Sequence, residues 1–174
     1  MDAQKIRSLR TLREAEGYYE LELFDAALEV LATLPSCGPH IPAMFALRGE
    51  VLRSAERYGE GADAFEKLIS AMPGSVEGHI GLGWCRKRQG RLDLAVRAME
   101  SLLDARPDEP IGLYNLACYC ALAGERDRAL RLLSRAVSGD PGYKAMAREE
   151  ADFAGLSDDP EFRRLTESAS DSTS

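Results

Sequence analysis

Small and apolar residues recur along this chain every 34 positions, with polar residues between them. Counted from residue 8, the eighth and twentieth positions of each 34-residue unit are Ala or Gly, and the twenty-fourth and twenty-seventh are apolar. Apolar residues three apart in a polar segment are typical of one buried face of an α-helix. The small positions are Ala15, Gly49, Gly83, Ala117, Ala27, Gly61, Ala95 and Ala129, and the apolar ones are Leu31, Phe65, Met99, Leu133, Leu34, Leu68, Leu102 and Ala136. The pattern predicts helices that approach closely at the small residues and fill the space beside them with the apolar ones.

Prolines mark the same period, because Pro39, Pro73, Pro107 and Pro141 stand 34 residues apart. Proline does not continue a helix interior, so each one separates two units. The units are 8–41, 42–75, 76–109 and 110–143. Self-similarity at this period is typical of an all-α solenoid of antiparallel helix pairs, in which each unit buries its apolar face against its neighbours.

Each unit is expected to divide into two helices at its fifteenth position. Gly90 and Gly124 stand there in the last two units and suit the positive φ that often ends a helix. The first two units have Glu22 and Glu56 instead, which makes those two turns less well defined. Pro35 is expected to shorten the second helix of the first unit.

The two ends of the chain depart from the pattern. Residues 1–7 are predicted to lead into the first helix, and 144–166 to form a helical cap over the last apolar face. In the cap, Tyr143 to Phe153 is expected to be one helix, and Asp159-Pro160-Glu161 to begin another that buries Phe162 and Leu165. The polar, Ser-rich stretch 167–174 is expected to be a disordered tail.

Composition and charge narrow the function. The hydrophobic fraction of 45% is enough for a core, and the net charge of −7 disfavours nucleic acid and anionic membrane surfaces as partners. The sequence contains no membrane-spanning run, so no membrane insertion and a cytoplasmic location are predicted. The four cysteines form no C-x-x-C pair and the two histidines lie beside no Ser or Cys in sequence, so we expect no metal, no cofactor and no enzymatic activity.

The repeated residues carry a resemblance to a known family. Leu82-Gly83, Gly90, Ala95, Met99, Leu102 and Pro107, with their counterparts 34 residues later, resemble the tetratricopeptide repeat (TPR). The resemblance covers 8–143, and the run from Ala151 to Leu165 is similar to the closing segment of many bacterial proteins of the family. It implies a right-handed superhelix whose first helices line a concave groove at repeat positions 2, 5, 9, 12 and 13.

Those positions define a candidate partner-binding groove, with an apolar part toward the C-terminal half and charged residues at its border. One subclass of the family clamps a C-terminal carboxylate, but position 5 is never basic here and only Asn115 matches, so that role is rejected. Trp84 has two interpretations, an exposed anchor for a partner or part of the wall between helices. Gly81, on the groove edge, also has two interpretations. Either the helix simply tolerates a glycine there, or the glycine leaves room for the backbone of a ligand. The candidate groove residues are Leu12, Glu16, Tyr19, Glu50, Ile80, Trp84, Lys87, Arg88, Ile111, Tyr114, Asn115 and Cys118.

The sequence thus predicts a non-catalytic scaffold or adaptor that binds a partner peptide or helix in this groove. Two alternatives stay open: a structural protein that self-associates into a homo-oligomer, and a small bacterial secretion chaperone of the same repeat type. The groove hypothesis requires Ile80, Trp84 and Tyr114 to be free of other segments of the chain.

Overall fold

The computed structural model describes residues 3–167, and all regular structure in that range is helical, which confirms the all-α fold. The chain forms two compact units, Met1–Arg91 and Leu92–Ser174. All but the first residue of the predicted tail at 167–174, and the first two residues of the predicted lead-in, lie outside the described range. Residues 3–7 of that lead-in already belong to the first helix.

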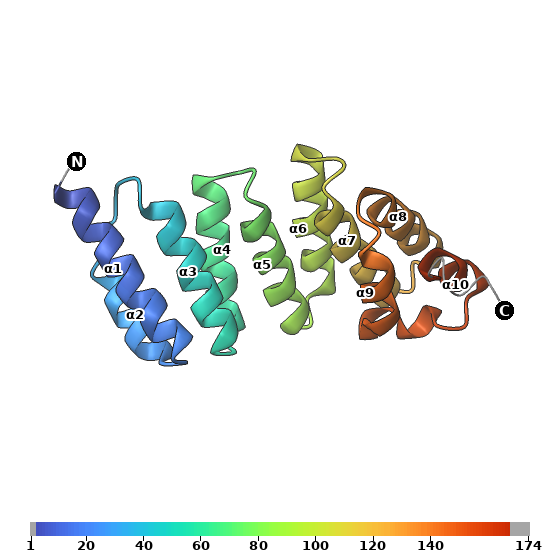
Figure 1. Ribbon diagram of the computed structural model, residues 1–174, viewed down its shortest axis with the longest axis horizontal. Helices are drawn as coiled ribbons and strands as arrows, with labels where there is room; N and C mark the ends of the chain where they lie inside the picture. Colours follow the sequence, from blue (N-terminus) through green and yellow to red (C-terminus); the bar gives the residue numbers. More distant parts are fainter. Residues whose placement is uncertain (1–2, 168–174) are drawn as a thin grey trace. The chain divides into compact units, whose positions relative to one another are not determined.

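The first unit contains five helices in its described part (Figure 1): α1 (Ala3–Glu20), α2 (Phe24–Ala32), α3 (Ile41–Ser54), α4 (Tyr58–Ala71) and α5 (Val76–Arg88). α1 packs against α2 and α3, and α3 packs against α4 and α5. The first helices of successive repeats, α1, α3 and α5, therefore lie side by side, with α2 and α4 behind them as their partners.

The second unit contains α6 (Leu92–Ala105), α7 (Pro110–Leu122), α8 (Arg126–Gly139), α9 (Tyr143–Glu149), the short 3-10 helix η1 (Ala151–Leu156) and α10 (Pro160–Thr166). α7 is central, since it packs against α6, α8 and η1. α10 contacts both α8 and α9, so the C-terminal segment folds back onto the last helix pair (Figure 1).

The recurring positions form the core, as predicted. All eight small residues and all eight apolar residues are buried. Phe65 shows why the small ones are needed: a Cβ on Gly49 would come within 2.6 Å of its ring, and a Cβ on Gly61 would stand 3.2 Å from Cys85 Sγ. The close approach of helices at the small positions is therefore confirmed.

All four turns within the repeats have the same geometry, whether or not they contain glycine. Gly90 and Gly124 have φ of 73° and 76°, and Glu22 and Glu56 both have φ of 58°. In each turn the next residue donates its N–H to a carbonyl five residues earlier, as Arg57 does to Leu52 at 2.8 Å. These are Schellman-type helix ends, and two glutamates adopt a conformation that glycine adopts more easily.

Two boundaries follow from local sequence. α2 has 9 residues whereas α4, α6 and α8 have 14 each, which confirms the shortening expected from Pro35. At the other end, α10 begins at Pro160, and Asp159 Oδ1 accepts hydrogen bonds from the N–H groups of Glu161 and Phe162 at 2.9 and 3.3 Å. The predicted N-cap and first-turn proline are thus confirmed.

The prediction of a single helix from Tyr143 to Phe153 is wrong. The chain leaves the helix at Glu150, which is extended with φ of −78° and ψ of 118°, and η1 follows. The Glu150 carboxylate accepts a hydrogen bond from the Asp152 N–H at 3.3 Å and so caps the new helix. This break lets Phe153 turn back onto α7 and become buried there.

Candidate partner-binding surface

Trp84 is the centre of a cluster of aromatic rings and guanidinium groups in the first unit. It projects from α5 and is half-buried, with the Arg53 guanidinium 5.0 Å and the Arg88 guanidinium 5.5 Å from its ring centre. The ring of Tyr58 meets it edge-on at a centroid distance of 5.4 Å. Arginine over an indole face is a favourable cation–π arrangement, so the cluster is ordered before any partner arrives.

Each arginine of this cluster is held by a second contact. Arg53 donates to the Glu50 carboxylate from Nε at 3.1 Å and also from a terminal nitrogen. Arg88 donates to the Tyr58 hydroxyl at 3.2 Å, with its guanidinium 5.3 Å from that ring. These bonds hold both cations next to the Trp84 ring and leave an aromatic and cationic surface on α3 and α5.

Both interpretations of Trp84 hold in part. Its inner side packs against a core cluster of Ala62, Phe65, Leu68 and Cys85, and part of the ring stays open to solvent. The Trp84 side chain therefore packs between helices on one side and presents part of its ring to solvent on the other.

Charges near the cluster are perturbed by their surroundings. Burial lowers the pKa of Arg53, but the hydrogen bond from Arg53 to Glu50 and the charge of that carboxylate outweigh it, so the pKa lies above the ordinary value. Burial and the neighbouring Glu50 charge raise the pKa of Glu77, which lies on the first turn of α5. A cation fits this surface less well than an apolar or anionic group, because two fixed arginines already occupy it.

The remaining predicted groove residues of the first unit differ in exposure. Glu16 is exposed, whereas Ile80 and Lys87 are half-buried. The Tyr19 hydroxyl lies 3.1 Å from Ser54 Oγ and links the ends of α1 and α3, and its ring contacts Phe24 at 6.2 Å. Leu12 is buried in a core cluster with Ala15, Leu31 and Leu34, so it is not freely exposed as a groove residue would be.

In the second unit the groove prediction is wrong for Tyr114 and Cys118. They are only 5% and 3% exposed, because the C-terminal segment covers this face of α7. The Tyr114 ring stacks on Tyr143 at 4.6 Å and meets Phe153 edge-on at 6.0 Å, and burial raises the pKa of its hydroxyl. The requirement that Tyr114 be free is therefore not met, and only the first-unit part of the predicted surface remains accessible.

The two other groove residues of α7 offer little to a partner. Ile111 is half-buried, and the Asn115 side-chain amide donates to the Ile111 carbonyl at 2.8 Å, within the same helix. A carboxylate clamp at Asn115 is therefore unsupported by its geometry as well as by its neighbours.

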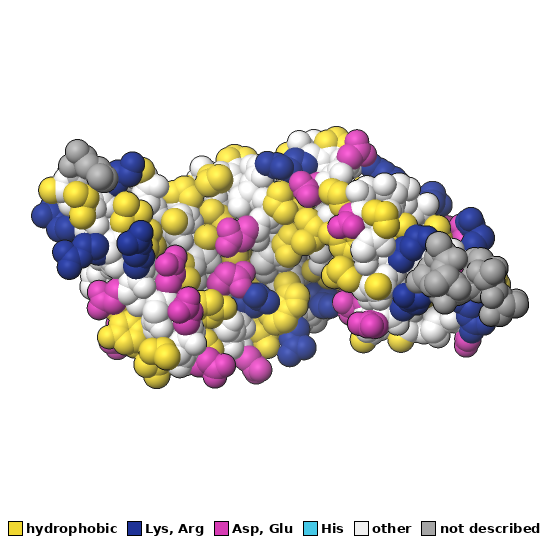
Figure 2. Space-filling view, viewed as in Figure 1, with side chains coloured by type: hydrophobic (Ala, Val, Ile, Leu, Met, Phe, Trp, Pro, Cys, Tyr) yellow, Lys and Arg dark blue, Asp and Glu magenta, His cyan; other side chains and the backbone are white. Residues whose placement is uncertain are grey.

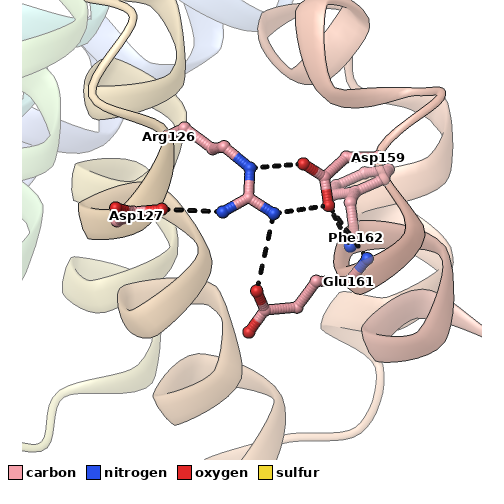
Figure 3. A network of polar contacts seen from close by, with 5 residues as sticks. All are labelled: Arg126, Asp127, Asp159, Glu161 and Phe162. Atoms are coloured by element: carbon pink, nitrogen blue, oxygen red, sulfur yellow. Dashed lines mark hydrogen bonds and ion pairs between the residues drawn. The ribbon is translucent and has the colours of Figure 1, made fainter.

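Ion pairs fasten the covering segment to α8 (Figure 3). Arg126 donates to Asp159 from Nε at 2.5 Å and from a terminal nitrogen at 3.0 Å, and it also contacts Asp127 and Glu161. The Asp159 carboxylate thus accepts hydrogen bonds both from Arg126 and from the N–H groups at the start of α10. On the inner side Phe153 contacts Phe162 at 5.4 Å, which completes an aromatic layer beneath the salt bridges.

The arginine-rich face of α8 is committed to intramolecular contacts. Besides Arg126, Arg128 pairs with Glu100 at 2.5 Å and Glu125 at 3.1 Å, and Arg135 pairs with Asp108 at 2.9 Å. Three of the four arginines are thus neutralised locally, which favours a structural role over an anion site.

Both histidines are structural. His40 and His79 are buried, and each lies 2.8 Å from a backbone carbonyl, that of Pro35 and that of Ser75 respectively. Within residues 3–167 no three His, Cys, Asp or Glu side chains are grouped to hold a metal ion. In the same range, every helix is too short or too polar to cross a membrane.

Sequence reasoning missed one contributor to the surface. Tyr58 begins a second helix, outside the repeat positions expected to face a groove. Arg53 stands at position 12 of the second unit, one of the positions expected to face the groove, and lies over the Trp84 ring. Gly81 also has a different role from either one expected. A Cβ there would lie 2.3 Å from Phe65 Cζ, so the glycine makes room for a core ring and not for a ligand.

Comparison with known proteins agrees with this architecture. The family model of the tetratricopeptide repeat matches residues 52–116. No curated protein sequence matches the chain. Solved structures match it well in fold: MamA residues 41 to the end from Desulfovibrio magneticus RS-1 has a TM-score of 0.72 at 15% identity, with 100% of this chain and 99% of that one covered.

Two further solved structures carry the family name. YrrB, described as a TPR protein with an unusual peptide-binding site, has a TM-score of 0.68 at 16% identity, and 94% of this chain and 89% of that one are covered. TTC0263, a thermophilic TPR protein of Thermus thermophilus, has a TM-score of 0.65 at 17% identity, with 91% and 86% covered. At these identities the likeness establishes the fold.

Proposed function

Because this chain is a tetratricopeptide-repeat protein, by its family match at residues 52–116 and by its fold, we propose that it is a non-catalytic scaffold that binds a partner peptide or helix. TPR proteins are generally interaction modules. The binding surface is the one formed by α1, α3 and α5 in the first unit, with Trp84 as its anchor. The peptide-binding site named for YrrB supports a peptide as the class of partner.

The observation that carries this proposal is the half-buried Trp84 with two fixed arginines beside its ring. Partly desolvated tryptophan and arginine side chains are the residue types that contribute most to interfaces, each about 2 kcal/mol or more at a hot spot. Their positions are set by Glu50 and Tyr58 before binding, which lowers the entropy lost on association. Apolar side chains of a partner, with an acid nearby, complement such a surface.

The test uses Trp84 as its own reporter, since it is the only tryptophan in the chain. Peptides selected from a display library against the purified protein are titrated while tryptophan emission is followed. Binding at this surface shifts the emission of Trp84. Arg88→Ala removes one cation and its Tyr58 contact from the exposed side, and we expect it to weaken binding about tenfold or more.

Arg131→Ala is the matched control, because Arg131 is an exposed arginine on α8 in the other unit. It is expected to leave affinity unchanged. Peptides that bind without changing Trp84 emission, and equally well to the Arg88→Ala variant, would place recognition elsewhere and refute the proposal.

The same sample distinguishes self-association from the scaffold function. Light scattering over a wide concentration range reports the oligomeric state, and a stable oligomer that Arg88→Ala dissociates would show that the surface serves a second copy of the chain. A monomer that binds selected peptides supports the scaffold. The secretion-chaperone alternative makes the further prediction that the partner is an unfolded secretion substrate.

A further inference from the structure

Exposed apolar side chains are concentrated on α1 and the turn that follows it. Ile6, Leu9, Leu21 and Leu23 make up more than half of the large apolar side chains that are exposed among residues 3–167. A single exposed apolar residue is ordinary, but a group of them on one short stretch of chain marks an interaction surface. These four side chains are left over after α1 has packed on its own unit through buried residues such as Leu12.

Residues of α1 that recur at a spacing of three or four form one continuous face, which we call the outer face. This spacing places side chains above one another along a helix. Apart from the half-buried Gly17, all of these residues are exposed. The outer face consists of Ile6, Leu9, Arg10, Arg13, Gly17 and Glu20.

The charges of α1 are divided between its two ends. From Ala3 to Arg13 the charged residues are all basic, and from Glu14 through the turn to Glu22 they are all acidic. Figure 2 shows basic side chains toward the N-terminal end of this helix and acidic ones toward its other end. This order opposes the helix macrodipole, which favours acids near the N-terminus and bases near the C-terminus. A second helix of the same kind, lying antiparallel, would offset this cost because its dipole and its charges run the other way.

The charged groups of the outer face have no partners in the part of the chain that the structure describes. Arg10, Arg13 and Glu20 are exposed, and none of them forms an ion pair or a side-chain hydrogen bond there. The arginines of α8 differ, since Arg128 and Arg135 pair with acids of their own unit. The outer face therefore presents both signs of charge for pairing with another molecule.

Gly17 has no role in packing the first unit. A Cβ on it would meet no atom within 4 Å, whereas a Cβ on Gly81 would collide with the ring of Phe65. Glycine inside a helix weakens it, so such a position usually has a packing reason. The first unit supplies none for Gly17, but the missing side chain would let the backbone of a second helix approach α1 closely.

The repeat register shows that the outer face is a docking face. Arg13 and Gly17 stand 34 positions before Leu47 and Val51 of α3. Leu47 packs against the core cluster of the preceding repeat, and Val51 is fully buried. The corresponding face of α1 has the shape to receive a helix, but it carries arginine where α3 carries leucine. The complementary helix therefore brings acidic groups to this face.

We propose that α1 pairs antiparallel with α1 of a second copy of this chain through the outer face. Arg13 of one copy lies against Gly17 of the other. In the same register, Arg10 lies opposite Glu20, since residue numbers that face each other in an antiparallel pair have a constant sum. A second copy supplies the reversed order of charge by symmetry, so the contact is self-complementary.

The apolar residues meet in the same register. Leu9 of one copy lies opposite Leu21 of the other, and the two-fold axis repeats every pair. Ile6 reaches the turn that holds Leu23 in the same way. A contact along one helix is smaller than the interfaces of permanent complexes, so we expect a dimer that dissociates on dilution, with a Kd of about 10 μM.

Sedimentation of the full chain over a concentration range of about 1–500 μM tests for this dimer. We expect monomers to convert into dimers across this range. Because exposed charges are screened by salt, raising the salt from about 0.05 M to about 0.5 M should weaken the dimer about tenfold. A monomer at every concentration, or a dimer that is insensitive to salt, would overturn the proposal.

Charge reversal tests the register. Arg10→Glu places two acids opposite each other and Glu20→Arg places two bases opposite each other, so each variant alone should have a Kd raised about tenfold or more. An equal mixture of the two should form heterodimers, because every arginine again faces a glutamate. The matched control Arg131→Glu changes an exposed arginine on α8 and should leave the Kd unchanged. Persistent homodimers of either variant, or a mixture that stays monomeric, would exclude the antiparallel register.

Gly17→Gln tests the close approach. Its side chain fills the space reserved for the second helix and should raise the Kd about tenfold, while the melting temperature of the monomer stays the same or rises because glutamine favours helix more than glycine. Gly155→Gln is the control, since a Cβ at Gly155 also meets nothing within 4 Å. A Gly17→Gln chain that melts lower, or that still dimerises normally, would contradict the role given to Gly17.

The dimer contact and the scaffold function fail separately. Arg88→Ala should leave the dimer intact, and monomeric Arg10→Glu should still bind the peptides that shift the emission of Trp84. Loss of peptide binding with the dimer unchanged would refute the scaffold alone. A dimer that Arg88→Ala dissociates would move the contact to Trp84 and overturn the assignment to α1.

Discussion

Phe65 of α4 lies so close to Gly81 of α5 that a Cβ on the glycine would stand 2.3 Å from Phe65 Cζ. The ring is fully buried, and Gly49 of α3 approaches it from a second helix, so Phe65 is surrounded and has no room to withdraw. One aromatic ring therefore fixes the packing of three helices.

Gly81→Ala is consequently expected to destabilise the chain. Alanine in a helix gains about 1 kcal/mol over glycine, but overpacking a rigid core costs about 1–3 kcal/mol, and here the obstacle is a ring held on both faces. We expect a net loss of about 1–2 kcal/mol in the free energy of unfolding, measured by denaturant titration.

A double variant checks the cause. Phe65→Leu shortens the side chain and should make Gly81→Ala much less harmful than it is in the native background. Gly155→Ala is the control, because nothing lies within 4 Å of a Cβ at that position. Equal losses at Gly81 in both backgrounds would contradict the steric explanation.

The two glutamates with positive φ offer stabilising substitutions. Glu56→Gly relieves a left-handed conformation that costs a non-glycine residue about 1–2 kcal/mol, less the extra entropy of glycine in the unfolded chain. A gain of about 0.5–1 kcal/mol is expected. Glu29→Gly, at an exposed position inside α2, should instead lose about 1 kcal/mol, and Gly124→Ala should lose a similar amount. Thermal melts of the three variants, compared with the native chain, test the sign of each change.

Thiol reactivity should single out Cys37. It is exposed, whereas Cys85, Cys118 and Cys120 are buried, and burial raises the pKa of the Cys85 and Cys120 thiols to about 11. Because the thiolate is the reactive form, a disulfide reagent at about pH 8 should modify one cysteine quickly in the native protein and all four after unfolding. Rapid modification of two or more in the folded state would contradict the burial.

The same thiols make the fold sensitive to alkali. A pKa of about 11 in the folded state, against an ordinary value of 9.0, means that the folded chain holds these protons more firmly than the unfolded chain. The stabilisation is complete below about pH 9 and is lost as the pH rises toward 11, with a slope of about 1.4 kcal/mol per unit for each thiol. Cys85→Ala should flatten this decline in urea titrations between pH 8.5 and about 11.

Neighbouring aspartates at the start of α10 should differ in effect. Asp159 caps the helix and pairs with Arg126, while the Asp158 side chain is 95% exposed and, within residues 3–167, pairs only with Arg163. Asp159→Ala should lower the melting temperature by several degrees and Asp158→Ala by little. Arg126 lowers the pKa of Asp159, so this contribution is present above the ordinary Asp pKa and lost as the pH falls below it. Equal effects of the two variants in melts near neutral pH would contradict this assignment.

The repeated core was predictable because close packing leaves each recurring position only one kind of residue. Ala, Gly and large apolar side chains stand every 34 residues, and every one is buried. The Schellman turns at Glu22 and Glu56 were harder to predict, because glutamate gives no local signal for positive φ. Only their register with Gly90 and Gly124 pointed to them.

The candidate site was predicted less well, for a physical reason. Repeat register places Trp84 and Arg88 on a first helix, but the contact with Tyr58 depends on how α4 sits beside α5. The prediction that Tyr114 is exposed was wrong because the segment that covers it lies after the last repeat. That segment reaches Tyr114 through a break in the helix at Glu150, which helix propensity does not reveal. The role of Gly81 likewise required the rotamer of Phe65.

The turn at Glu150 also determines where the array can grow. Tyr143, the last residue of the fourth unit, begins α9, and its ring stacks on Tyr114. A designer who appends further modules must first replace the segment from Glu150 to Leu156, because it occupies the face on which the next module has to dock.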